Sequence, residues 1–189
     1  MTIRVVSAGL LAAAGLVLQA CSGGADDGGE TAEVSSDTLA LLVADQSELS
    51  IVSETLGDAG LAQVFDGAAA YTLLAPRDAA FDELGEAAQD LQTAEQRPAM
   101  VAILRDHIVP GYLTPADIAN AIEQADDGSV EMRTMGDHTL TFTGEGEVVT
   151  VTGEDGATAQ FAGDALRASN GVAIPLDAVL RKLGEAPAG

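Results

Sequence analysis

The sequence predicts an α+β domain in which a helical N-terminal half packs against a strand-rich C-terminal half. Apolar residues recur at three- and four-residue spacing over residues 39–56, which indicates amphipathic helices. In 139–142 and 148–152, apolar residues instead mix with threonine at a two-residue period, which is typical of strands. This change of period within a chain of 189 residues favours one domain of mixed class.

Several short helices are expected in the N-terminal half. The periodic segment 39–56 divides near Gln46, and a further helical turn follows at 61–65. A longer helix is expected over 97–108, where apolar residues share one face. Thr114-Pro115 predicts the N-cap and the first residue of the next helix.

Two strand-like runs lie near the two ends of the domain. The apolar run 70–75 is followed by Asp78, which we expect to be the N-cap of a helix. Asn170-Gly171 predicts a hairpin-like turn into a last strand over 172–180. Because Pro175 has no N–H to donate, this strand is expected to lie at an edge or to bulge there. The strands between these runs are expected to form a meander.

Residues 1–20 are expected to be a lipoprotein signal peptide. Arg4 precedes an apolar core over 5–18, which is shorter than the roughly 20 residues of a membrane span. Leu18-Gln19-Ala20-Cys21 resembles the lipobox of bacterial lipoproteins, from which Gln19 departs. The resemblance implies cleavage before Cys21 and attachment of acyl chains such as palmitate to that residue. The alternative is an ordinary signal peptide followed by a chance cysteine.

Residues 21–37 are expected to form the lipidated Cys21 and a flexible acidic tether, because Gly, Ser, Asp and Glu dominate them. The domain is expected over 38–183 and a small polar tail over 184–189. Lipid on Cys21 would hold the protein to a membrane by about 0.8 kcal/mol per buried methylene. We therefore expect export from the cytoplasm and a lipid anchor in the cell membrane or the outer membrane.

The charge of the chain excludes one class of partner. The sequence holds 30 acidic and 8 basic residues, which gives a formal net charge of −22. A protein that binds nucleic acid needs a basic surface, so nucleic acid is not an expected partner. Aromatic residues make up only 3%, so the core must be built mainly from aliphatic side chains.

Three segments of the domain resemble the fasciclin-like domain family, in its order and at its spacing. Residues 72–81 (TLLAPRDAAF) resemble its first signature, and 104–111 (LRDHIVPG) resemble its central motif. Residues 168–180 (ASNGVAIPLDAVL) resemble its second signature. The resemblance covers nearly the whole domain and implies a single fasciclin-like α+β fold that mediates adhesion or binding at the cell envelope.

The chain departs from the family pattern at several positions. Leu74 and Arg77 stand where the first signature usually has Phe and Thr. Ile174-Pro175 stand where the second signature has His-Val, so any role of that histidine is not carried over.

Few residues are candidates for chemistry. His107 lies in an apolar stretch and is expected to be buried, holding the helix end to the turn at Pro110; a ligand role is the alternative. His138 is expected to be a loop residue. Residues 126–129 with Glu131 hint at a calcium loop, but the full twelve-residue pattern is missing. We expect a solvated acidic loop there, and no metal or cofactor.

No catalytic motif occurs in the sequence, so an enzyme is not expected. The expected function is that of a lipid-anchored envelope protein whose domain mediates adhesion or binds a protein or glycan. The alternative is a periplasmic or cell-surface protein that binds a small molecule or an ion. The sequence assigns no binding residue besides the lipid attachment at Cys21.

Overall fold

Helices come first and strands follow along most of the chain, in a computed structural model that describes residues 34–65, 67, 69–146 and 148–182. The expected signal peptide, Cys21, most of the tether and the tail lie outside the described residues. Within the described part of the chain, no helix is long and apolar enough to cross a membrane.

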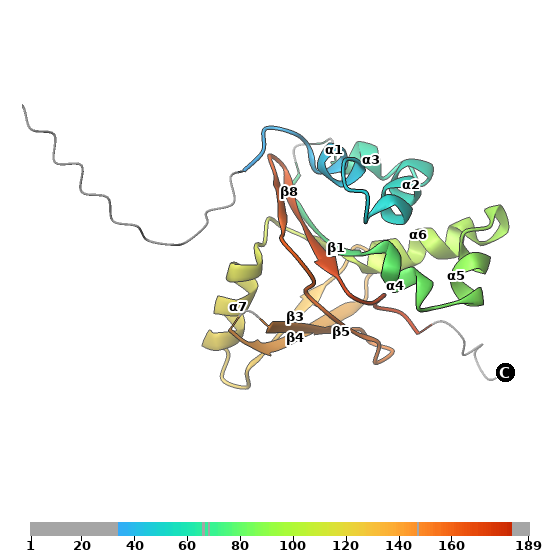
Figure 1. Ribbon diagram of the computed structural model, residues 1–189. Coiled ribbons are helices and arrows are strands. Elements are labelled where there is room, and N and C mark those ends of the chain that lie inside the picture. The colour runs from blue at the N-terminus through green and yellow to red at the C-terminus, as the bar shows by residue number, and fades with distance from the viewer. Residues whose placement is uncertain (1–33, 66, 68, 147, 183–189) are drawn as a thin grey trace, which may run out of the picture. The chain divides into compact units, whose positions relative to one another are not determined.

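Short helices make up one side of the domain (Figure 1). They are α1 (Leu39–Ala44), α2 (Ser50–Asp58), α3 (Ala62–Phe65), α4 (Asp78–Asp82), α5 (Glu86–Leu91), a 3₁₀ turn (Ala94–Gln96) and α6 (Arg97–Asp106). A further helix, α7 (Pro115–Gln124), lies beside the strands (Figure 1). Thr114 is its N-cap and Pro115 its first residue, as predicted, and Asp117 completes a capping box with Thr114.

The strands form two sheets of four. Sheet A has the order β2-β1-β8-β7, with β1 (Tyr71–Pro76), β2 (Ile108–Pro110), β7 (Leu166–Ala168) and β8 (Gly171–Leu176). Sheet B is an antiparallel meander of β3 (Ser129–Arg133), β4 (Thr139–Glu145), β5 (Val148–Thr152) and β6 (Thr158–Gln160).

Sheet A is buried on both faces because it lies between the helices and sheet B. Leu73 and Ala75 of β1 pack into a core with the helices. Leu74, between them, packs into a second core with α7 and with Phe142 and Val151 of sheet B. A strand covered on both sides needs apolar residues at successive positions rather than at alternate ones. This explains why β8 is a continuous apolar run and β1 is one apart from Thr72.

The structure confirms the α+β class and the helical and strand-rich halves, and it adds that the halves share sheet A. β1 comes from the helical half, yet it pairs in parallel with β8, with Tyr71 opposite Gly171. The helix expected over 97–108 is too long. α6 ends at Asp106, because the next residues form β2 on the open edge of β1. Helix α5 and strands β3 and β7 were not predicted.

The strand that contains Pro175 was expected to lie at a sheet edge, but it does not. β8 is central, but β7 pairs only with its first residues, Gly171–Ala173. The Pro175 carbonyl accepts the Ala162 N–H at 2.9 Å, on the side away from β1. The missing N–H of proline would point to that same side, so the ladder with β1 loses no hydrogen bond.

Asp78 caps a different helix from the one expected. It is the first residue of α4, and its carboxylate accepts the backbone N–H groups of Ser50 at 3.2 Å and Ile51 at 3.0 Å. These N–H groups lie at the start of α2, 28 and 27 positions earlier in the chain. Asp78 therefore joins the strand-to-helix corner after β1 to a helix on the same side of sheet A.

The Asn170-Gly171 pair also acts at longer range than expected. Ser169 and Asn170 connect β7 to β8, and Gly171 is already the first residue of β8. The Asn170 side chain accepts the Leu39 N–H at 2.8 Å and donates to the carbonyl oxygens of Phe65 and Gly67. Asn170 thus holds the start of α1 and the end of α3 against the sheet.

Glycine is required at position 171 because atoms of β1 and α1 lie too close to leave room for a side chain. A turn conformation is not the reason. A Cβ atom at this position would lie 2.5 Å from the Tyr71 carbonyl oxygen and 2.9 Å from a methyl carbon of Leu39. Both distances are shorter than van der Waals contact, so any side chain would separate β8 from β1 or displace α1.

Asp78→Ala should destabilise the domain by about 1–2 kcal/mol, because two N–H groups at the start of α2 lose their acceptor. Chemical denaturation monitored by circular dichroism would measure the change. Asp82→Ala is the matched control, since Asp82 is an exposed residue of the same helix α4. Equal stability of the two variants would contradict the cap.

Gly171→Ala should destabilise the domain by roughly 1–3 kcal/mol, because the added methyl group overlaps buried backbone. Gly57→Ala is the matched control: Gly57 lies inside α2 with no atom within 4 Å of the new Cβ. That substitution should stabilise the domain by up to about 1 kcal/mol, because alanine favours helix. Similar unfolding midpoints for both variants would contradict the close approach.

Candidate functional site

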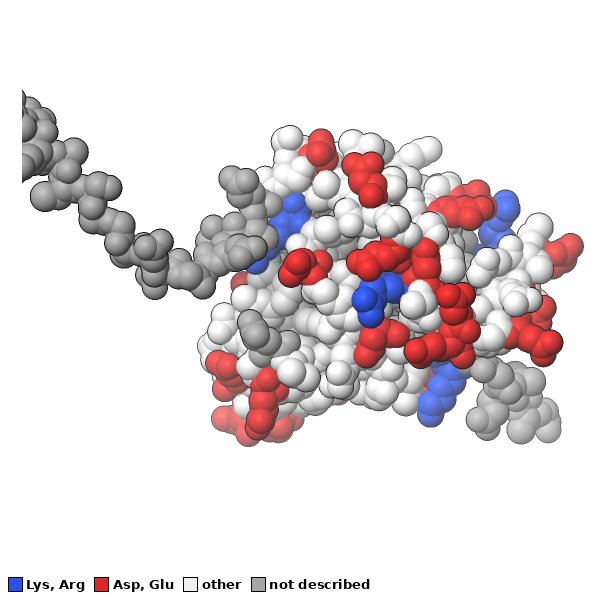
Figure 2. Space-filling model, viewed as in Figure 1, with Lys and Arg blue, Asp and Glu red and all other residues white. Residues whose placement is uncertain are grey.

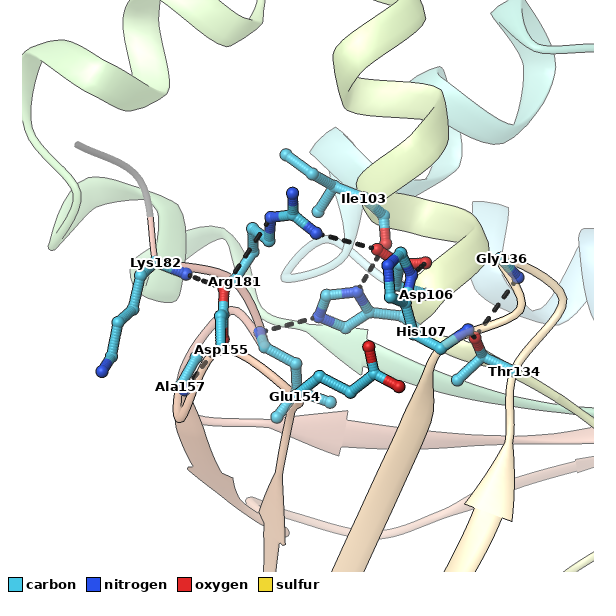
Figure 3. A network of polar contacts seen from close by, with 12 residues as sticks. Ile103, Asp106, His107, Thr134, Gly136, Glu154, Asp155, Ala157, Arg181 and Lys182 are labelled. Atoms are coloured by element: carbon cyan, nitrogen blue, oxygen red, sulfur yellow. Dashed lines mark hydrogen bonds and ion pairs between the residues drawn. The ribbon is translucent and has the colours of Figure 1, made fainter. Parts of the chain in front are cut away.

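A network of polar side chains lies where α6, two loops and the C-terminal segment meet (Figure 3). His107 is buried at its centre, with 1% of its surface exposed. Its Nδ1 donates to the Ile103 carbonyl at 2.8 Å, and its Nε2 accepts the Leu180 N–H at 2.9 Å. Only a neutral imidazole can make both bonds. Burial lowers the pKa of His107, against the opposing effects of the Ile103 carbonyl and the Asp106 charge.

Asp106 is a buried carboxylate beside His107. Its Oδ1 accepts from His138 Nδ1 at 2.6 Å, and its Oδ2 lies 3.5 Å from an Arg181 guanidinium nitrogen. Gly136 passes so close to the carboxylate that a Cβ atom there would overlap it. Two partners and a glycine loop therefore enclose the charge that α6 carries at its end.

Asp155 extends the network to the turn between β5 and β6. Burial acts to raise the pKa of this carboxyl. The N–H groups of Ala157 and Lys182 and the positive charges of Arg181 and Lys182 outweigh it, so the pKa lies below its ordinary value. The Lys182 N–H donates to Asp155 at 2.8 Å, which fixes the C-terminal segment against the turn.

The outward side of α6 borders an open groove, which we call the α6 groove. It lies between α5, α6, the loop 135–138 and Arg181-Lys182, and its volume is about 1590 Å³. The buried side of α6 carries Met100, Ile103 and Leu104, so the arginines at its ends are left facing outward. The groove combines apolar and charged side chains and is open to solvent.

The structure places the residues singled out in the sequence as follows. His107 is buried and hydrogen-bonded as expected, but it binds the C-terminal segment at Leu180 rather than the turn at Pro110. His138 lies in a loop as expected, and it also contacts Asp106. In the acidic loop, Asp127 accepts the Ser129 N–H at 3.2 Å, which closes a turn.

Sequence reasoning missed Asp106, Arg181 and the α6 groove. Four separate segments of the chain form the groove, and no motif links them. One local signal was present. Arg97, Val101 and Arg105 recur every four residues, which places them on one stripe of α6.

The order of the elements and the two packed sheets match a known family. The family model of the fasciclin domain matches residues 47–182. The chain belongs to the fasciclin domain family. Both signature regions and the His107 segment lie within the matched range, so the network and the α6 groove are parts of the fasciclin domain itself.

One solved structure similar to this fasciclin domain is that of a FAS1 domain pair from the insect cell adhesion molecule fasciclin I. The TM-score is 0.66 and the sequence identity is 17%, so the likeness shows the fold alone. The match covers 77% of this chain and 51% of that chain, so this chain spans about half the length of the domain pair. No curated protein matches the chain.

His107→Gln should destabilise the domain by about 2–3 kcal/mol near neutral pH, because buried hydrogen-bond partners lose their geometry. In the wild type, the pKa of His107 is lower in the folded protein than its ordinary value of 6.5, which applies to the unfolded chain. The neutral His107 therefore contributes its full stabilisation only above about pH 6.5. The contribution falls as the pH drops toward the folded pKa, because the unfolded chain then binds a proton that the folded one does not.

The stability difference between wild type and His107→Gln should therefore narrow from about pH 7.5 to about pH 5. Urea denaturation of both proteins at both pH values measures this difference in the free energy of unfolding. The pH dependence that comes from the carboxylates is common to both proteins, so it cancels in the difference. A difference that stays constant would contradict a neutral, buried His107.

Proposed function

We propose that this protein is a lipid-anchored envelope protein whose fasciclin domain mediates adhesion by binding a protein or a glycan. The observation that carries the proposal is the fasciclin domain match over residues 47–182. A similarly folded domain pair comes from a molecule named as a cell adhesion molecule, which agrees with a binding role. The proposal includes no catalytic activity.

The anchor rests on the N-terminal sequence. Arg4, the short apolar core and Leu18-Gln19-Ala20-Cys21 together fit a cleaved lipoprotein leader. Acyl chains on Cys21 would bind the membrane, and the chain after it would act as a spacer. This arrangement would present the domain to partners outside the cytoplasm.

The shape of the α6 groove favours a polymer over a small molecule as the partner. Small-molecule sites are usually clefts of about 300–1,000 Å³ that enclose most of their ligand. The α6 groove has a volume of about 1590 Å³ and is open. A chain-like partner can occupy such a groove along its length.

Cys21→Ala should release the protein from the membrane fraction, because the acyl chains have no attachment site. Intact-mass analysis of protein extracted from native membranes should show wild type cleaved before Cys21 and carrying acyl chains. Ser22→Ala is the matched control and should stay anchored, since it changes the next residue and keeps the thiol.

Cells that carry the wild type should adhere to a surface coated with envelope or matrix material more strongly than cells that carry Cys21→Ala. Wild-type protein found soluble and without acyl chains would overturn the anchor. Equal adhesion of cells with and without the protein would overturn the adhesive role.

A further inference from the structure

We infer that the α6 groove binds an acidic polypeptide segment in which carboxylates alternate with apolar side chains. This inference rests on the proposed binding function and names its site and the chemistry of its partner. It depends on the distribution of charge, on the geometry of α6, and on the apolar residues of the groove.

Positive charge is concentrated in the α6 groove. The chain has 8 basic residues against 30 acidic ones, and Asp and Glu dominate the face seen in Figure 2. Four of the eight basic residues line the groove: Arg97, Arg105, Arg181 and Lys182. Only three acidic residues line it, namely Asp90, Asp106 and Asp137. A partner with negative charge is therefore repelled by most of the surface and repelled least here.

The arginines of α6 stand on one stripe with an apolar residue between them. Arg97 and Arg105 flank Val101 at four-residue spacing, which separates the two arginines by about 12 Å along the helix axis. A guanidinium binds a carboxylate with two parallel hydrogen bonds. The stripe fits a segment whose carboxylates are separated by about the same distance, with an apolar side chain between them.

The two arginines are available to a partner at small cost. Arg97 lies 2.9 Å from Asp58, but both side chains are about half exposed, at 53% and 44%. Such a surface pair contributes only about 0–1 kcal/mol and can exchange. The exposed Arg105 guanidinium makes no hydrogen bond or ion pair with another residue in the described part of the chain.

Arg181 has a different role, because its guanidinium already lies 3.5 Å from the buried Asp106 and 3.7 Å from the exposed Asp155. Its guanidinium contributes positive charge to the groove beside these two carboxylates. The carboxylate of Asp106 is in turn held by His138 at 2.6 Å. The network of Figure 3 thus positions one wall of the α6 groove.

The remaining lining favours a polypeptide over an anionic glycan. Between the cations lie the apolar side chains of Pro98, Ala99, Val101, Ala102 and Met135. These residues offer no hydrogen-bonding group to sugar hydroxyls, but they can bury leucine or valine side chains of a peptide. The combination of separated cations and apolar surface is the complement of an amphipathic acidic segment.

The test uses the full chain and a fluorescently labelled helical peptide of about fifteen residues, in which Glu and Leu alternate at every fourth position, so that successive Glu residues lie about 12 Å apart along the helix. Binding is measured by fluorescence anisotropy at about 0.1 M salt. The expected result is binding that weakens about tenfold in Arg105→Glu. Arg133→Glu is the matched control, because Arg133 is an exposed arginine outside the groove, and it should bind as the wild type does.

Four results would overturn the inference. The first is that the peptide does not bind, and the second is that a peptide with Gln in place of Glu binds equally well. The third is that Arg105→Glu and Arg133→Glu lose the same affinity for the peptide. The fourth is that a sulfated oligosaccharide binds more tightly than the peptide and that its binding depends on Arg105. Sedimentation checks that the variants stay in the same oligomeric state, and a dimer that dissociates in Arg105→Glu would assign the groove to a second copy instead. Thermal unfolding checks that both variants fold.

The cell adhesion assay separates this inference from the proposed function. Adhesive cells whose protein does not bind the peptide would overturn the groove assignment alone. Peptide binding by a protein that never promotes adhesion would overturn the adhesive role alone.

Discussion

The parallel pairing of β1 with β8 is the constraint on which the other packing depends. It joins Tyr71 to Gly171 at one end and Pro76 to Leu176 at the other, in a sheet buried on both faces. A strand with no exposed face must be mainly apolar, and it must be covered from both sides. The buried Thr72 of β1 satisfies its hydroxyl by donating to the Gly111 carbonyl at 2.8 Å. The helices cover one face and sheet B with α7 covers the other, so each half of the sequence is needed to bury a strand from the other half.

Single polar residues fix this arrangement at its two ends. Asn170 joins the start of α1 and the end of α3 to the turn that enters β8. His107 joins the end of α6 to the segment that leaves β8. Each side chain is a short-range signal in the sequence, part of an Asn-Gly turn or of a helix end. In the structure each one satisfies backbone groups from elements distant in the chain.

The sequence predicted well what depends on local periodicity. The division of 39–56 into two helices, the Thr114 cap and the meander strands β4 to β6 all follow from patterns within a few residues. It predicted poorly what depends on pairing. The residues of β2 continue a helical pattern, and they become a strand only because β1 offers an open edge. The α6 groove was not predicted, because its walls come from segments that share no motif.

The pairing of the first strand with the last has a consequence for how the chain folds. Residues 71–76 and 171–176 must meet before the central sheet exists, and contacts between such distant segments are slow to form. Until β8 is available, the apolar face of β1 has no parallel neighbour, and the helices before it lack their anchor at Asn170. Synthesis of the N-terminal part alone therefore cannot complete the fold. A nascent chain therefore carries β1 without its parallel partner until nearly the whole domain has been synthesised.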